Sequence, residues 1–171
     1  MEPSLYIIKG IILLDNDGNR ILGKYYDSTF SSVKEKREFE KKLFNKTHKA
    51  NGEIVMIDGL TIVYRSIVDL HFYVIGSTNE NEVVLVSVLN CFYDTLSMVL
   101  KRGVEKRAII EYMDTCTLAL DEICDSGIIL EIDPMSVLHR VSIRDNDLPL
   151  GEQTLFDVFK MAKDQLKSNF R

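Results

Sequence analysis

Two apolar, strand-forming runs, at residues 5–14 and 21–26, are separated by only six residues, and this spacing constrains the fold most strongly. Both runs, LYIIKGIILL and ILGKYY, are rich in branched or aromatic side chains, which fit the pleated surface of a β-strand. The intervening DNDGNR holds two aspartates, two asparagines and a glycine. These residue types tolerate the positive φ of tight turns. We therefore predict a β-hairpin.

The oxygen-rich turn also raises the question of a calcium site. A calcium-binding EF-hand loop needs oxygen ligands at positions 1, 3 and 5, glycine at position 6 and a bidentate glutamate at position 12. Counted from Asp15, glycine falls at position 4 and Tyr26 falls at position 12. The flanking segments have the pattern of strands rather than helices. We interpret DNDGNR as a turn and expect no bound metal.

The rest of the pattern alternates strands with amphipathic helices. One helix opens at Ser31 or Ser32, and a second opens at Asn79, with Glu82 in the capping-box position, and continues to Leu100. The other expected elements are strands at 54–58, 60–66 and 70–76, a helix at 104–125 with Gly127 after its end, a helical turn at 135–140, a strand at 141–144 and an amphipathic helix at 154–166.

This order of elements predicts an α+β domain. We expect a five-stranded, mainly antiparallel sheet with helices packed on one face, which makes two layers. A chain of 171 residues is long enough for one such core. We expect residues 1–145 to form the domain and residues 146–171 to form a C-terminal amphipathic helix packed on or beside it.

Composition excludes several classes of function. A formal net charge of -5 lacks the basic footprint of a nucleic-acid-binding protein. The three cysteines form no C-x-x-C pair, which argues against a zinc ribbon or a disulfide framework and fits a reducing, intracellular setting. No apolar run approaches the roughly 20 residues of a membrane span. We therefore expect a soluble chain whose membrane role is indirect.

The sequence offers no constellation of residues for catalysis. His48, His71 and His139 lie far apart and belong to no metal-ligand pattern. Cys91 and Cys116 fall within apolar helix stripes, where cysteine is usually a small buried side chain. The first helix mixes lysines with glutamates, which favours a solvated face over a membrane-binding one. We predict an interaction module that has no enzyme activity, cofactor or metal.

Several long stretches carry a family resemblance. The order of elements, and the segment LALDEI followed by Gly127, are similar to the longin-type small chains of vesicle-coat adaptor complexes, and more specifically to the zeta subunits of the COPI coatomer. Those families usually have two glycines where this chain has Ser126-Gly127, and serine where it has Ile132. The matching stretches are SLYIIKGIILLDNDGNRILGKYYD (4–27), FEKKLFNKTH (39–48), GLTIVYRSIVDLHFYVIGS (59–77), LNCFYDTLS (89–97), VEKRAIIEYMDTCTLALDEICDSGIILEIDP (104–134) and EQT (152–154).

The resemblance implies a structural subunit of a coat. It implies an obligate heterodimer with the trunk of the coatomer gamma subunit, contact with the remaining coatomer subunits, and an indirect relation to a GTP-bound Arf GTPase. It also implies a cytoplasmic location, on the cytosolic side of Golgi membranes and COPI-coated vesicles. There the coat drives Golgi-to-ER retrograde transport and intra-Golgi transport, and the chain would meet the membrane only through the complex.

The resemblance also locates one family site. In clathrin-adaptor sigma chains, a hydrophobic pocket receives acidic dileucine sorting signals. The equivalent positions here are Val68, Leu70, Tyr93 and Val104. Tyr93 is bulkier than the aliphatic side chain expected at its position, so it should fill the pocket. We predict that this chain does not bind dileucine signals.

Partner residues and alternative functions remain open on sequence alone. Apolar residues off the main stripe of the third helix, Ile110 and Leu118, are our candidates for the gamma-subunit interface. A clathrin-adaptor sigma chain, or another longin-type trafficking module, would lack the extension after about Val141 and would own a cargo pocket. A cysteine hydrolase would need Cys91 or Cys116 as an accessible thiolate in electropositive surroundings.

Overall fold

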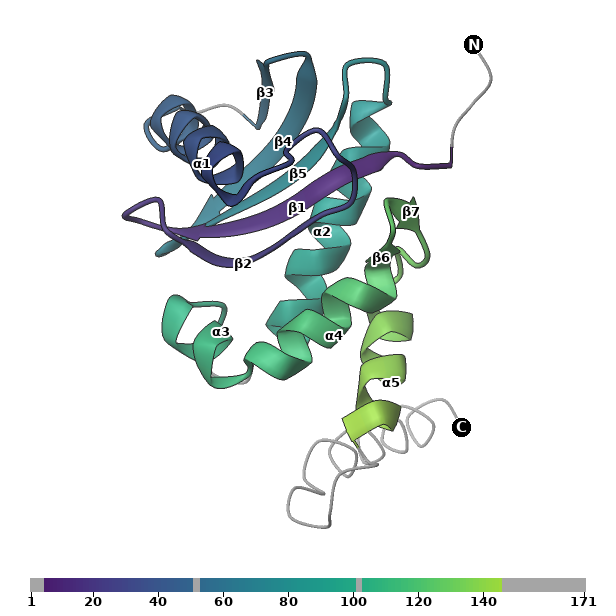
Figure 1. Cartoon of the computed structure of the whole chain (residues 1–171). Helices are drawn as coiled ribbons and strands as arrows, with labels where there is room; N and C mark the ends of the chain where they lie inside the picture. The colour runs from purple at the N-terminus through teal and green to yellow at the C-terminus, as the bar shows by residue number, and fades with distance from the viewer. Residues whose placement is uncertain (1–4, 51–52, 101–102, 146–171) are drawn as a thin grey trace, which may run out of the picture.

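A computed structural model describes residues 5–50, 53–100 and 103–145 (Figure 1). The helix expected at 154–166, within the expected C-terminal unit 146–171, lies outside these residues. In chain order the elements are β1 (Ile8–Asp15), β2 (Arg20–Tyr25), α1 (Val33–Thr47), β3 (Ile54–Ile57), β4 (Leu60–Ile67), β5 (Leu70–Ser77), α2 (Glu82–Val99), α3 (Lys106–Glu111), α4 (Met113–Ile123), β6 (Cys124–Asp125), β7 (Ile128–Ile129) and α5 (Pro134–Asp145).

The central sheet has the strand order β2-β1-β5-β4-β3, and every neighbouring pair is antiparallel. The predicted α+β fold with a five-stranded antiparallel sheet is confirmed.

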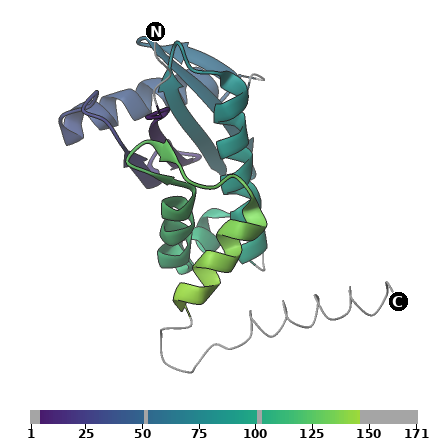
Figure 2. The ribbon, with the colours of Figure 1, turned by 90° about the vertical axis from the view of Figure 1, so that its right-hand side faces the viewer.

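Helices cover both faces of the sheet, because alternate side chains of its central strands point to opposite sides. Along β1, Ile11 and Leu13 belong to one apolar cluster, and Ile12 and Leu14 belong to another. α1 packs on the second cluster, whereas α2, α4 and α5 contribute to the first. In Figure 2 the sheet lies between α1 and α2. The expected two-layer arrangement is therefore corrected: the sheet is the middle layer of three.

α1 begins at a capping box. Ser32 has extended backbone angles, and its hydroxyl accepts a hydrogen bond from the amide of Glu35 at 3.1 Å. The Glu35 carboxylate in turn accepts from the amide of Ser32 at 3.3 Å. These two bonds satisfy amides that have no acceptor within the helix. The helix then buries Phe39 and Leu43 against the sheet. Ser32, rather than Ser31, is thus the start of the predicted helix.

α2 begins later than expected, because Asn81 rather than Asn79 is its N-cap. The Asn81 side chain accepts a hydrogen bond from the amide of Val83 at 2.9 Å. By length and composition alone, this helix of 18 residues is apolar enough to cross a membrane. The expectation that no segment is long and apolar enough is therefore too strict. Eight of its residues are buried inside the domain, so packing in the core accounts for its apolar character.

The single helix expected at 104–125 is divided in two. Tyr112 leaves the helical region, with φ −112° and ψ 34°, and separates α3 from α4. α4 ends at Cys124, which is extended and begins β6. The sequence predicts that Gly127 follows the end of this helix, and this prediction is wrong. Gly127 occupies the turn of the β6–β7 hairpin beside Ser126, and both residues have positive φ, 85° and 52°.

α5 is one continuous helix, so the strand predicted at 141–144 is wrong. Asp133 explains the helix start, because its carboxylate accepts from the amide and the hydroxyl of Ser136, at 2.9 and 2.7 Å. Pro134 takes the first helical position, where no amide donor is needed. The branched side chains of this segment pack into the core from a helix rather than from a strand. The buried residues that they supply are Val137, Leu138 and Val141.

Candidate functional site

A buried carboxylate closes the turn between β1 and β2. Oδ1 of Asp15 accepts hydrogen bonds from the amides of Asp17 at 3.0 Å and Asn19 at 2.8 Å. Gly18, with φ 76°, lets the chain reverse. The predicted hairpin is confirmed. Asp15 is only 3% exposed, and its oxygens are engaged by donors of the chain, which is the geometry of a turn rather than of a calcium loop. Within the described ranges, no group of three or more His, Cys, Asp or Glu side chains could hold a metal ion.

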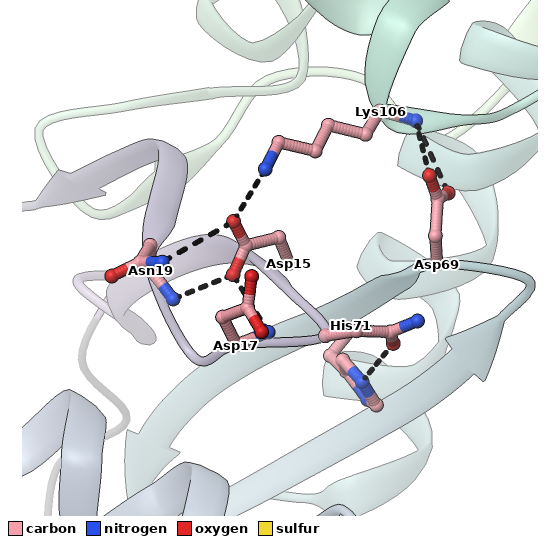
Figure 3. A network of polar contacts seen from close by, with 7 residues as sticks. Asp15, Asp17, Asn19, Asp69, His71 and Lys106 are labelled. Carbon is pink, nitrogen blue, oxygen red and sulfur yellow. Dashed lines mark hydrogen bonds and ion pairs between the residues drawn. The ribbon is translucent and has the colours of Figure 1, made fainter.

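Lys106 connects this turn to a second turn and to α3. Its ammonium nitrogen lies 2.7 Å from Oδ2 of Asp15. Its backbone amide donates to both carboxylate oxygens of Asp69, at 3.1 and 3.3 Å. Asp69 belongs to the turn between β4 and β5, and it supplies an acceptor at the start of α3, where helix amides lack one. Figure 3 shows the two carboxylates at the two ends of Lys106. We call Asp15, Asp69 and Lys106 the Lys106 tie.

Opposite charges stabilise the Lys106 tie. Burial by itself would raise the pKa of the Asp15 carboxyl group. The hydrogen bonds from Lys106 and from the amides of Asn19 and Asp17 outweigh burial and hold this pKa below its ordinary value. The contact with Asp15 raises the pKa of Lys106. Both groups are therefore charged at neutral pH. Since both oxygens of Asp15 already have donors, the tie fixes elements in place rather than offering a catalytic group.

His71 lies in the same region and has neutral hydrogen-bond partners. Nδ1 is 2.8 Å from Oγ of Ser66, and Nε2 is 3.0 Å from Oδ1 of Asn16. The ring meets Phe44 edge-on, with the centroids 5.2 Å apart. Burial, followed by repulsion from His48, lowers the pKa of His71. These contacts agree with the interpretation of His71 as a packed histidine rather than a general base.

The four positions that correspond to the dileucine pocket lie in two different environments. Leu70 and Val104 are buried in the apolar cluster to which α2 contributes. Val68 is 83% exposed, in the turn between β4 and β5, with φ 53°. The structure therefore brings Leu70 and Val104 together in the core but leaves Val68 outside it.

Tyr93, the fourth of these positions, is held on two sides. Its ring packs edge-on against Phe72, with the centroids 5.8 Å apart, and the Arg65 guanidinium lies 4.3 Å from the ring centroid. That no dileucine signal binds stays a prediction, and these two contacts are its physical basis. Arg65 also lines a surface hollow of about 580 Å³, but none of the four positions of the dileucine pocket lines it. The residues that line it are Ala50, Glu53, Tyr64, Arg65, Ser66, Val86, Leu89 and Asn90.

The two candidates for the partner interface differ in exposure. Ile110 on α3 is 54% exposed. Leu118 on α4 is half-buried and packs against the main apolar cluster. Ile110 therefore leaves apolar surface exposed, whereas Leu118 mainly serves the core, and the interface role of both stays a prediction.

The Lys106 tie is the feature that sequence reasoning missed. Asp15 has a local signal, because an aspartate at the start of an Asn- and Gly-rich turn commonly accepts bonds from amides two residues on. Asp69 and Lys106 have no local signal that connects them to Asp15, since Lys106 lies 91 positions away from it. Only the antiparallel pairing of β1 with β5 brings the two turns together.

The three cysteines are all buried. Burial raises the pKa of Cys91 to about 11, that of Cys116 to about 12 and that of Cys124 to about 11. Thiols with such pKa values stay protonated at neutral pH, whereas the thiolate is the nucleophile. None of the three cysteines is therefore the reactive thiolate that a cysteine hydrolase would need.

Comparisons with known proteins place the chain in a family. Residues 7–148 match the family described as clathrin adaptor complex small chain. The chain is 56% identical to coatomer subunit zeta-1 of Homo sapiens, with 98% of this chain and 94% of that protein covered. It is 39% identical to coatomer subunit zeta-2 of Arabidopsis thaliana, with 97% of each covered.

A structural comparison supports the same fold. A structure titled "Homology model of the full-length AP-3 complex in a stretched open conformation" contains a similar chain, with a TM-score of 0.64 and 15% identity. The likeness covers 82% of this chain and 95% of that chain. At that identity it shows a shared fold and nothing further. The chain belongs to the clathrin adaptor complex small chain family, in which its sequence relatives are coatomer zeta subunits.

Proposed function

We propose that this chain is a small structural subunit of the COPI coatomer coat. The observation that carries the proposal is the 56% identity to human coatomer subunit zeta-1 across nearly the whole length of both chains. The finer proposal is that it pairs with the trunk of the gamma subunit as an obligate heterodimer. Through that pairing it supports Golgi-to-ER retrograde transport and intra-Golgi vesicle transport.

In this role the chain works in the cytoplasm and on the cytosolic side of Golgi membranes and COPI-coated vesicles. The remaining coatomer subunits surround it, and an Arf GTPase recruits the assembled coat. The role needs no catalysis. The occupied carboxylates of the Lys106 tie and the protonated thiols support a structural subunit over an enzyme.

Exposed apolar side chains support burial against a partner. Ile110 lies on α3, and a second group lies around the backbone bridge between Tyr6 and Ile128. Leu130 and Ile132 are the exposed members of that group on the segment after β7. Permanent interfaces between subunits commonly bury about 2,000 Å² or more and are more apolar than transient ones. Side chains of this kind suit such an interface.

Co-expression with the gamma-subunit trunk tests the proposal. We expect a stable one-to-one complex by size-exclusion chromatography with light scattering. The chain expressed alone should be prone to aggregation. Ile110→Asp should weaken the complex. Val83→Asp is the matched control: Val83 is also apolar and exposed but lies on α2 rather than α3, so this change should not weaken the complex. A well-behaved monomer that ignores the gamma trunk would contradict the assignment.

A clathrin-adaptor sigma-type chain, or another longin-type trafficking module, is the alternative. The family match and the likeness to the AP-3 structure are compatible with it. It predicts pairing with the large subunit of a clathrin adaptor in place of the coatomer gamma trunk. The same co-expression, carried out with both kinds of large subunit in parallel, separates the two possibilities.

A further inference from the structure

α1 is a basic element in an acidic chain. Its sequence VKEKREFEKKLFNKT holds six lysine or arginine residues and three glutamates, whereas the whole chain has a net charge of -5. Read from the sequence, this mixture resembles a balanced, solvated face. In the folded protein, however, these charges differ in whether they have partners.

Two of the three glutamates are used within the protein. Glu40 is buried, and its Oε1 accepts from Arg20 at 2.7 Å and from the Tyr25 hydroxyl at 2.9 Å. The Glu35 carboxylate is engaged by the amides of Ser31 and Ser32 at the start of the helix. Neither carboxylate is therefore available to balance the cations on the outer side of α1.

The cations of the outer side stay exposed. Lys34, Arg37 and Lys41 recur at helical spacing on the side of α1 opposite to its buried residues. We call these three residues the basic stripe. Among the described residues, Arg37 and Lys41 have no hydrogen bond or ion pair, and Lys34 has only a long contact of 3.9 Å with Glu38. The stripe borders an open hollow that Val33 and Glu38 also line.

We propose that the basic stripe contacts the phosphate-rich surface of an anionic phospholipid membrane. α1 is the outermost layer on its side of the sheet (Figure 2), so the three cations can approach one plane together. Lysine is depleted at protein interfaces, whose centres are built from apolar and aromatic anchors. The stripe has no such anchor beyond Val33 at its end. Anionic headgroups attract lysine and arginine without one.

This contact adds a direct attachment to the expected attachment through the complex. A basic residue near an anionic bilayer strengthens binding by roughly fivefold, so that three residues give roughly a hundredfold. That is weak for a single chain, but many copies within one coat would add their contacts through avidity. Only this avidity step rests on the proposed function; vesicle binding by the basic stripe itself depends on α1 alone.

Flotation of the full chain with vesicles tests the proposal. At about 50 mM salt, where screening is weak, we expect binding to vesicles that contain about 30% phosphatidylserine and none to pure phosphatidylcholine. Binding should disappear at about 500 mM salt. Arg37→Glu should lower the partition coefficient about tenfold or more, and Glu38→Gln should raise it. Arg107→Glu makes the same charge change at an exposed position of α3 and should leave binding unchanged.

Each other outcome overturns the proposal. Absence of wild-type binding at low salt would exclude a direct membrane contact. Equal losses for Arg37→Glu and Arg107→Glu would show a non-specific effect of net charge. Binding to soluble polyglutamate without binding to vesicles would assign the stripe to an acidic polypeptide instead. Circular dichroism verifies the fold of each variant, and Lys41→Glu serves as a second stripe variant. Pairing with the gamma trunk is measured separately, so failure here leaves the proposed function untouched.

Discussion

Gly127 is the residue at which the β6–β7 turn meets β1. The amide of Ile8 donates to its carbonyl oxygen at 3.0 Å. A Cβ atom at Gly127 would lie 2.7 Å from the carbonyl oxygen of Ile8, which is closer than Cβ atoms approach backbone oxygens. Its φ of 85° also belongs to the left-handed region that favours glycine. Two independent requirements therefore select glycine at this position.

Gly127→Ala should lower the free energy of unfolding by more than about 2 kcal/mol, because left-handed strain and a backbone clash act together. Urea unfolding followed by circular dichroism measures the loss. Ser126→Ala is the matched control. It places alanine in the same turn, at a residue that already carries a Cβ atom at a φ of 52°, and should change stability by less than about 0.5 kcal/mol. Equal effects of the two substitutions would contradict the close approach to Ile8.

At the scale of elements, α3 shows dependence on distant residues. A helix of six residues is too short to be stable from its own propensity. The Lys106 tie supplies external contacts, since Asp69 caps its start and Asp15 binds its first side chain. α3 is therefore held in place by the two turns of the sheet.

The charge of Asp15 should make stability depend on pH. Its pKa is lower in the folded protein than the ordinary value of 3.8, so the unfolded chain takes up the proton more readily. The stabilisation is then fully present above about pH 4 and is lost as pH falls through the folded pKa. Asp15→Asn keeps an oxygen for the amides but removes the charge. We expect lower stability at neutral pH and a shallower decline in acid than in the wild type.

Urea unfolding at a series of pH values from about 2 to 7 covers this window. Asp17→Asn removes a charge from the same turn but leaves the ion pair between Lys106 and Asp15 in place, and its curve should stay close to that of the wild type. Parallel curves for the wild type and Asp15→Asn would show that the Asp15 charge contributes nothing through the tie.

Local signals predicted the elements that depend on local chemistry. DNDGNR indicates the hairpin because Asp15 and Gly18 are turn residues by their own conformational preferences. The division of the expected helix at Tyr112 has no signal in the apolar pattern, which runs through it. The carboxylate that caps the start of α3 was not predictable either, because it comes from the turn between β4 and β5. The strand expected at 141–144 is wrong for a different reason: its branched residues continue a helix whose start signal, Asp133, is local. The Lys106 tie was not predictable because Lys106 lies 91 positions from Asp15 in the sequence.

On the scale of the whole molecule, the two faces of the sheet have different roles. One face buries α2, α4 and α5, and it holds Leu70 and Val104 of the dileucine position in the core. The other face supports α1, whose outer side remains exposed (Figure 2). The sequence predicted the helices and most of the core. It did not predict this division, because helical periodicity does not reveal which face of a sheet a helix will cover.

The packed dileucine position predicts a negative binding result. Titration of a labelled acidic-dileucine peptide into the chain paired with the gamma subunit should give no saturable binding in the micromolar range, because Phe72 and Arg65 hold the Tyr93 ring in place. A clathrin-adaptor pair that contains a sigma chain is the positive control. Saturable micromolar binding to this chain would contradict the prediction.

The pairing of β1 with β5 has a consequence for the order of folding. It places Ile11 beside Val74 and Leu14 beside His71, so β2, α1, β3 and β4 all lie within the loop that this pairing closes. Contacts between residues so far apart in sequence slow folding, because the loop must close before the contact stabilises anything. During synthesis, the β1–β2 hairpin can form early, but the sheet cannot join its two halves until β5 has left the ribosome. Until then the apolar residues of β1 remain uncovered, and the nascent chain needs protection from aggregation.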